Sequence, residues 1–384
     1  MRPARESSAL DATAGCGFRA PARSRRRWRR GAIGLLVAAA VSVPACTPIR
    51  YYTHAIWGGA KLMVQREPVE RLLGRGHLSE DLRARLELAL DIRDFASREL
   101  ALPDNRSYRT YVATGRSAVT WNVVAAPELS VEPVVWCFPI AGCVSYRGYF
   151  QRERAERFAR RLERDGLDVR VSPVAAFSTL GWFADPLLDT FLRYPDWQLA
   201  GLLFHELAHQ VVYVPSDTTF NESFATVVEI EGVRRWLELE GRGEEIEAAR
   251  SGLAQEAAFL RLLMRARACL AEAYASTASD VARRARKVEL FAWLQQDGQA
   301  AIDAGVLGPG YQGWFAAPLN NADVASVADY EAYVPALREV FAEAGSFPGF
   351  YRAAAELAAL APEERARRLA APSADLAAAG CPSR

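Results

Sequence analysis

The stretch that decides the fold is Leu202-Leu203-Phe204-His205-Glu206-Leu207-Ala208-His209-Gln210, which contains the pattern His-Glu-x-x-His. On a helix, His205 and His209 lie one turn apart on the same face, so both imidazoles can reach one metal ion. Glu206 is offset by one residue and can act on a water molecule at that metal without binding the metal itself. The flanking residues are apolar nearly all round the helix, which indicates a buried helix.

Two explanations fit a pair of histidines at this spacing. They can be core histidines whose nitrogens are satisfied by hydrogen bonds, or they can be ligands of a zinc ion. The chain contains only four histidines, so a chance match to the whole pattern is improbable. We therefore predict a zinc site at His205 and His209.

The third zinc ligand has to come from outside the motif. A catalytic zinc normally has three protein ligands and one open position. A third histidine in the pattern HExxHxxGxxH is excluded, because Val212 and Pro215 occupy the glycine and histidine places. A carboxylate remains, and Glu222 supplies one, with twelve residues between it and His209 and a turn at 215–217. We expect Glu222 to lie in the first turn of a second, antiparallel helix.

Glu222 also has an alternative role. Thr219-x-x-Glu222 matches a capping box, in which the glutamate caps the start of its own helix. The other candidate ligands are Asp217 and Glu229, the latter two helical turns further along. We favour Glu222 as the ligand.

Periodicity and turn residues predict the rest of the mature chain. We expect a helix over 78–100 with Ser79 as N-cap, a hairpin of 108–113 and 119–125, and a loop-like aromatic segment over 134–150. A helix over 151–165 ended by Gly166, a strand over 167–174 and an extended piece at 177–182 follow. Helices are expected over 197–213, 219–240, 244–275, 277–303 and in several short segments after 330. Together these elements predict one α+β domain over 46–384, with a mixed part (46–195) carrying a small antiparallel sheet and a mostly helical part (196–384).

The amino-terminal 45 residues look like an export signal. The segment Arg25-Arg26-Arg27-Trp28-Arg29-Arg30 precedes GAIGLLVAAAVSV, a 13-residue uncharged run ending at Val43 that is too short to span a bilayer comfortably. The following Val43-Pro44-Ala45-Cys46 resembles a bacterial lipobox, which would make Cys46 the lipidated first residue of the mature protein. An ordinary signal peptide or an uncleaved anchor is the alternative. We expect an outer-membrane lipoprotein that faces the periplasm and contacts the membrane through its lipid.

Charge and cysteine content bear on partners and compartment. The chain has 384 residues and a net charge of +1, but residues 1–45 carry nine arginines against two acidic residues, so the remainder is at −6. A domain of that charge is a poor nucleic-acid binder by electrostatics. Export leaves four cysteines, an even number that suggests disulfides. Cys137 and Cys143 bracket a Pro- and Gly-containing loop and can form a bridge or be two buried thiols, whereas we expect Cys269 to be a packing residue.

The motifs resemble those of known metallopeptidases. His-Glu-Leu-Ala-His-Gln (205–210) followed by Asn-Glu-Ser-Phe-Ala-Thr-Val-Val-Glu (221–229) resembles the HELAHQ and NEGFA pair of gluzincin aminopeptidases. In that clan the glutamate of the second motif is the third zinc ligand, which corresponds to Glu222. The interval between the motifs is shorter here than is usual in that clan. With WCFPIAGCVSYRGYF, STLGWFADPLL and LNNA, the chain more closely resembles a bacterial family of aminopeptidase-like proteins, many of them lipoproteins, over about residues 45–345.

This resemblance implies a zincin-like fold, a Zn²⁺ cofactor and a peptide substrate. Glu206 would take a proton from the attacking water and deliver it to the leaving amine. Gluzincins stabilise the oxyanion with a tyrosine or histidine, and our candidate is Tyr330, with Tyr146 and Tyr149 as alternatives. Residues 178–181 can be an edge strand that aligns a peptide, or a covered strand. The acid that would bind the substrate amine cannot be chosen from sequence among Glu128, Asp185, Asn320 and Asn321.

Three functions remain open at this point. The first and favoured one is a zinc aminopeptidase that hydrolyses peptides at the periplasmic face of the envelope. The second is a zinc endopeptidase or another amide hydrolase acting on envelope polymers. The third is a non-catalytic envelope lipoprotein with a structural zinc, against which the intact Glu206 argues.

Overall fold

The computed structural model of the chain describes residues 57–76, 78–138, 142–176, 179, 183–325, 333–369 and 380–382. These residues belong to one compact unit, residues 54–384. The expected signal segment, Cys46, Tyr330 and most of segment 177–182 lie outside the described residues. Within the described residues, no helix combines the length and the apolar character needed to cross a membrane.

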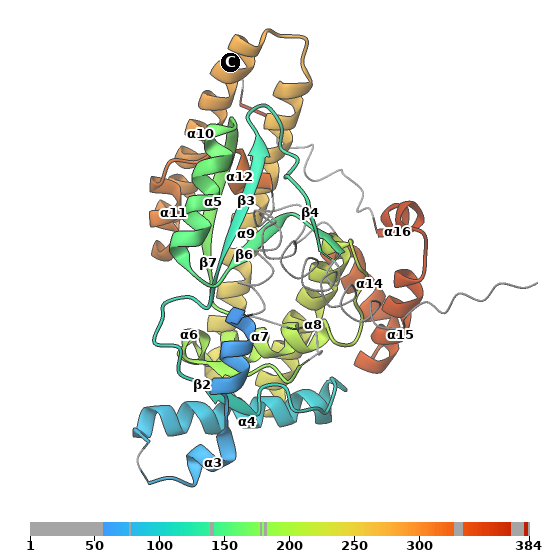
Figure 1. Cartoon of the computed structure of the whole chain (residues 1–384). Helices are drawn as coiled ribbons and strands as arrows, with labels where there is room; N and C mark the ends of the chain where they lie inside the picture. Colours follow the sequence, from blue (N-terminus) through green and yellow to red (C-terminus); the bar gives the residue numbers. More distant parts are fainter. Residues whose placement is uncertain are drawn as a thin grey trace, which may run out of the picture. The chain divides into compact units, whose positions relative to one another are not determined.

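The described chain is an α+β structure dominated by helices (Figure 1). Its strands are β1 (Glu67–Pro68), β2 (Thr110–Val112), β3 (Thr120–Pro127), β4 (Trp136–Phe138), β5 (Gly142–Val144), β6 (Tyr146–Tyr149), β7 (Leu167–Val174) and β8 (Leu187–Leu188). Its helices are α3 (Val69–Leu73), α4 (Glu80–Glu99), α5 (Arg152–Arg164), α6 (Asp189–Leu192), α7 (Asp196–Ala208), α8 (Thr218–Leu239), α9 (Gly243–Ala275), α10 (Asp280–Asp303), η1 (Pro309–Tyr311), α11 (Gln312–Ala316), α12 (Asn321–Ala325), α14 (Val334–Ala344), α15 (Phe347–Ala358) and α16 (Pro362–Leu369).

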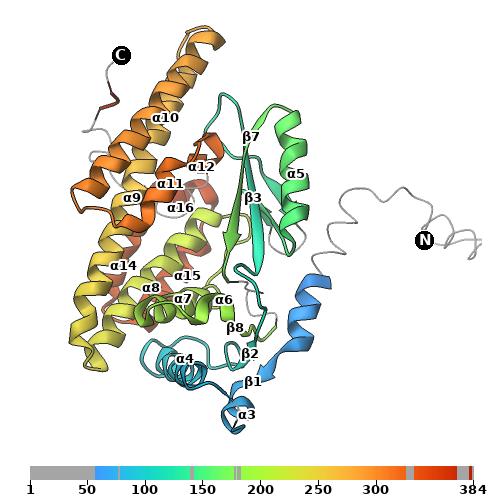
Figure 2. The same ribbon diagram turned by 90° about the vertical axis from the view of Figure 1, so that its left-hand side faces the viewer.

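The longest strands form an antiparallel sheet in the order β6-β3-β7. Helix α5 packs on one face of this sheet and α12 on the other, as Figure 2 shows. Helix α5 ends as predicted, because Gly166 adopts a φ of +82° that lets the chain reverse into β7. The predicted antiparallel sheet of the amino part is therefore present, although its strand pairing differs from the expectation.

Two predictions about the strands were wrong. Strand β2 does not form a hairpin with β3, but pairs antiparallel with β1 and parallel with β8. The expected turn at 114–116 instead binds to the start of α6, since the backbone N–H groups of Thr114 and Gly115 donate to the Asp189 carboxylate at 2.9 and 2.8 Å. Segment 134–150 is not a loop, because β4 and β5 pair there and β6 joins β3. Cys137 and Cys143 lie opposite each other in that pair and form a disulfide.

The central helices α7 and α8 pack side by side, with α4 against α7 and α14 against α8. Apolar side chains from these helices make the larger core, and Leu203, Phe204 and Leu207 of α7 are fully buried in it. Helix α7 ends at Ala208, earlier than the predicted residue 213. Turns follow the helix, since the N–H of Gln210 donates to the Leu207 carbonyl and the N–H of Val211 to the Ala208 carbonyl, and the Asn221 side chain then bonds both the N–H and the C=O of Val214.

A second core lies between α9, α10 and α12. The expectation that Cys269 is only a packing residue was wrong, since it forms a disulfide with Cys381 across 112 residues of sequence. Cys269 is nonetheless buried in this core, so its helix position and its bridge are compatible. The bridge holds the described piece of the carboxyl terminus against α9.

Candidate functional site

The site is built on the end of α7 and the start of α8. His205 lies in the last turn of α7, and His209 is the C-cap residue that follows it. Glu222 lies in the second turn of α8, one turn after the helix begins. Asp217, not Thr219, provides the N-cap, because its carboxylate accepts from the backbone N–H of Phe220 at 3.0 Å. The capping-box alternative was therefore wrong, and Glu222 is available for another role.

The two histidines and Glu222 converge on one point. His205 Nε2 is 3.3 Å from Glu222 Oε2, and His209 Nε2 is 3.8 Å from Glu222 Oε1. One ligand atom from each of the three residues lies within 4.8 Å of the others. The imidazole rings stand nearly perpendicular, with centroids 4.9 Å apart. The structure thus brings together the three side chains that the sequence analysis selected.

The alternative ligands occupy other places. Glu229 Oε2 is 3.0 Å from His205 Nδ1, at the opposite edge of the ring from Glu222. A single ion at Nε2 cannot also bind a carboxylate at Nδ1, so Glu229 orients the ring and is not a co-ligand. Asp217 pairs with Arg365 at 2.6 Å in addition to capping α8. The absence of a side chain at Gly201 accommodates the Glu229 side chain, since a Cβ at Gly201 would lie 3.0 Å from Glu229 Oε1.

Charge interactions in the cluster oppose the effect of burial. Burial lowers the pKa of His205, but the Glu222 and Glu229 carboxylates raise that pKa well above its usual value in the metal-free protein. Burial raises the pKa of Glu222, but the two histidines outweigh burial and hold that pKa below its usual value. Burial lowers the pKa of His209 to about 4. A neutral His209 beside an ionised Glu222 matches the protonation states that metal ligands require.

His209 provides the test of whether a metal fits. Its side chain is only 7% exposed, and its Nδ1 atom is buried without a hydrogen-bond partner among the described residues. Its Nε2 atom faces Glu222 at 3.8 Å, beyond hydrogen-bond distance. A buried imidazole without polar partners is costly unless a ligand satisfies it. The donor set of two imidazoles and one carboxylate suits zinc, and these residues fit such an ion.

Three residues near the cluster escaped the sequence analysis as functional groups. Glu229 was weighed only as a ligand, whereas it is the partner of His205 Nδ1. The half-buried Tyr213, four residues after His209, has its pKa raised by burial and by the Glu222 charge. Glu256 of α9 has its pKa raised by burial and by the Glu229 charge. Tyr213 could have been selected from the sequence, because it closely follows the motif. The interaction of Glu256 could not, because Glu256 belongs to a separate helix, α9.

The other residues proposed from sequence have partners within the fold. Tyr149 is buried beside Phe158, with ring centroids 5.7 Å apart. Tyr146 lies next to Arg147 on the same strand, β6, which pairs with β3. The candidates for amine recognition are held by neighbours: Glu128 by Arg284, Asp185 by the Thr179 N–H, Asn320 by the Val169 carbonyl and Asn321 by Tyr274.

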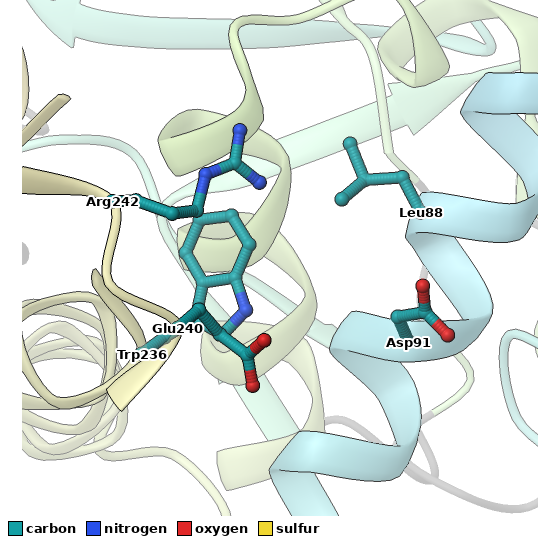
Figure 3. Close-up of a pocket in the computed structure, with 5 residues that line it drawn as sticks. All are labelled: Leu88, Asp91, Trp236, Glu240 and Arg242. Atoms are coloured by element: carbon teal, nitrogen blue, oxygen red, sulfur yellow. The ribbon is translucent and has the colours of Figure 1, made fainter. Parts of the chain in front are cut away.

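A pocket of about 340 Å³ lies elsewhere, between α4 and the end of α8 (Figure 3). Leu88 and Asp91 line it from α4, opposite Trp236, Glu240 and Arg242. The Arg242 guanidinium lies over the Trp236 ring at 4.6 Å and also pairs with other acidic side chains. None of the three clustered residues lines this pocket, and we assign it no role in chemistry.

Comparison with known proteins identifies the family. The model of the family described as "putative aminopeptidase" matches residues 50–369. That range is most of the chain, so the chain belongs to this family, and the family resemblance inferred from the motifs is confirmed. No curated protein and no solved structure matches the chain.

Proposed function

We propose that this family member is a zinc-dependent aminopeptidase that hydrolyses peptides at the periplasmic face of the cell envelope. The observation that carries the proposal is the convergence of His205 Nε2, His209 Nε2 and a Glu222 oxygen within 4.8 Å of one another. Membership of an aminopeptidase family supports a peptidase-like activity. The lipid anchor at Cys46 and the outer-membrane location rest on the sequence alone.

His205, His209 and Glu222 would hold the zinc ion, and Glu229 would fix the His205 ring by accepting from its Nδ1–H. When bound, zinc supplies a Lewis acid that makes water nucleophilic near neutral pH and polarises a carbonyl group. The intact Glu206 distinguishes this set from a purely structural metal site, which needs no additional carboxylate.

Glu206 is the general base of the proposal. It follows His205 on α7, about 100° further round the helix, and is partly exposed. From there its carboxylate takes a proton from the attacking water and delivers it to the departing amine. Both transfers use one carboxylate, because the group that accepts the first proton is the acid for the second.

A hydrogen-bond donor for the developing oxyanion is the remaining requirement. Tyr213 is a candidate donor among the described tyrosines, because its phenol interacts electrostatically with Glu222. Burial and that charge raise the pKa of Tyr213, which keeps the phenol protonated and able to donate. Tyr330 lies outside the described residues and stays a prediction from sequence.

The experiment compares zinc-loaded full-length chain with Glu206→Gln on peptides that have free or acetylated amino termini. Cleavage of free-amine peptides only, lost in Glu206→Gln, is the expected result. Cleavage of acetylated peptides at comparable rates would identify an endopeptidase instead. Equal activity of Glu206→Gln and the wild type would contradict the assigned mechanism.

A further inference from the structure

The loop between the metal ligands contacts a disulfide-bridged hairpin. The backbone N–H of Cys143, in β5, donates to the Ser216 hydroxyl at 3.1 Å. The two segments also meet at Gly142, where an added Cβ would lie 2.5 Å from Ser216 Oγ and 2.7 Å from the Ser216 nitrogen. Ser216 lies seven residues after His209 and six before Glu222. The hairpin of β4 and β5 therefore adjoins the segment that connects two of the ligands.

Ser216 needs such a contact to hold its conformation. Its φ of +67° is a left-handed backbone conformation, which residues other than glycine keep only when the surrounding structure fixes it. On one side of Ser216, the Asn221 side chain holds the backbone of Val214. On the other side, Arg365 pairs with Asp217. The hairpin supplies the corresponding attachment at Ser216 itself.

His209 is the ligand whose position depends most on this loop. The His205 ring is held by Glu229 at Nδ1, and Glu222 lies within α8. His209 follows the last residue of α7, and its buried Nδ1 has no hydrogen-bond partner among the described residues. Packing and the backbone at the start of the loop therefore orient the His209 ring. A displacement of the loop would move this ring relative to Glu222.

The hairpin is a firm support only while its disulfide is intact. Strands β4 and β5 have three residues each and form a separate two-stranded sheet. An isolated sheet of two strands is marginally stable in water. Cys137 and Cys143 face each other in the middle pair of the ladder, and their bridge joins the strands covalently. Cys137 is exposed, so a small reductant can reach this bridge, whereas Cys269 of the second bridge is buried.

We propose that the Cys137–Cys143 disulfide is a positioning element of the metal site and that breaking it weakens zinc binding. This inference rests on the zinc site of the proposed function. The intact bridge keeps β5 against Ser216 and thereby keeps His209 at the distance from Glu222 that one ion requires. Reduction by a phosphine consumes one water molecule: the S–S bond breaks, each sulfur gains a hydrogen, and the phosphine becomes its oxide. Full zinc affinity would thus develop in an oxidising compartment, where disulfides form and persist.

The test measures the zinc affinity of the full-length chain by competition with a chromogenic chelator. Cys137→Ser/Cys143→Ser should bind zinc about ten- to hundredfold more weakly than the wild type, because serines cannot form the bridge. The matched control Cys269→Ser/Cys381→Ser removes the bridge across 112 residues and should keep the wild-type affinity. Ser216→Ala leaves the hairpin and its disulfide in place and should lose about two- to tenfold in affinity through the missing hydrogen bond.

Hydrogen exchange gives a readout that needs neither zinc nor peptidase activity. Treating the zinc-free wild type with tris(carboxyethyl)phosphine should speed amide exchange in peptides that cover residues 209–217. Cys137→Ser/Cys143→Ser should exchange equally fast there without the reductant, and Cys269→Ser/Cys381→Ser should exchange like the untreated wild type.

Unchanged zinc affinity in Ser216→Ala or in a folded Cys137→Ser/Cys143→Ser would overturn the role of the bridge. An equal loss in Cys269→Ser/Cys381→Ser would do the same, as would unchanged exchange over 209–217 after reduction. A wild type that binds no zinc would instead contradict the proposed function, and the exchange measurement would still decide whether the bridge holds the loop.

Discussion

Glu229 offers a sharp test of how the site is organised. Its only described hydrogen bond to the cluster is the 3.0 Å contact with His205 Nδ1. Partners of this kind fix the tautomer and the orientation of a ligating ring, and losing one typically weakens metal binding about 10- to 100-fold. We therefore expect Glu229→Ala and Glu229→Gln to bind zinc more weakly while the fold is retained.

The two substitutions should weaken zinc binding by different amounts. Glutamine keeps a carbonyl oxygen that can accept from Nδ1–H and loses only the charge, and the 26% exposure of the Glu229 side chain lets solvent screen that charge. We expect about a tenfold loss of affinity for Glu229→Gln, or about 1.4 kcal/mol. Alanine removes the acceptor altogether and should cost about 100-fold, or about 2.8 kcal/mol.

The assay is a competition titration with a chromogenic zinc chelator over a range of pH. In the wild type, proton binding to His205 competes with zinc below its raised pKa, so zinc affinity falls as the pH falls. Removing one of the two carboxylates lowers the pKa of His205, so the zinc affinity of Glu229→Gln should begin to fall at a lower pH than that of the wild type. Glu238→Gln, on the exposed side of the same helix, is the control. Wild-type zinc affinity in a folded Glu229→Ala would refute the reasoning.

Three further predictions concern the scaffold. Gly201→Ala should displace Glu229 and weaken zinc binding about tenfold in the same titration, since its Cβ would lie 3.0 Å from Oε1 and 3.2 Å from Cγ. Asp196→Asn should lower the free energy of unfolding by about 1–2 kcal/mol in urea at pH 7, because the partly exposed Asp196 carboxylate, at the start of α7, accepts hydrogen bonds from Arg85 and Arg242. Cys381→Ser should lower it by about 2–4 kcal/mol in calorimetry through loss of the bridge to Cys269.

The pH dependence of the Asp196 effect has a definite sign. Burial raises the pKa of Asp196, but hydrogen bonds from Arg242 and Arg85 outweigh burial and hold that pKa below its usual value. A depressed pKa contributes stability above the unfolded value of about 3.9 and loses it as the pH falls through the folded value. The difference between wild type and Asp196→Asn should therefore shrink below about pH 4. A constant difference down to pH 2 would contradict this account, as would an unchanged unfolding temperature in Cys381→Ser or unchanged zinc affinity in Gly201→Ala.

Local patterns predicted the part of the site that depends on helix geometry. The four-residue spacing of His205 and His209 requires only that α7 be helical, and the apolar residues around them predicted its burial. Glu222 could be selected because a turn at 215–217 returns the chain at the right distance. What could not be predicted was that Asp217 is the helix cap, since both Asp217 and Thr219 are suitable residues at suitable places.

Features that depend on long-range contacts were missed. The parallel pairing of β2 with β8 joins Tyr111 to Leu187, and nothing in the spacing of the strands specifies that register. The connectivity of four cysteines is likewise not fixed by sequence, so the bridge between Cys269 and Cys381 was not foreseen. Glu256 belongs to the same class, because its charge interacts with Glu229 of another helix only through the packing of α9 against its neighbours.

The central claim is that His205, His209 and Glu222 hold one zinc ion. The most direct measurement is the metal content of full-length wild type, Glu206→Gln and Glu222→Ala after dialysis against the same buffered zinc solution. We predict about one zinc per chain in the wild type and in Glu206→Gln, and loss of most of it in a folded Glu222→Ala. Retention of one zinc by Glu222→Ala, or its absence from the wild type, would contradict the account.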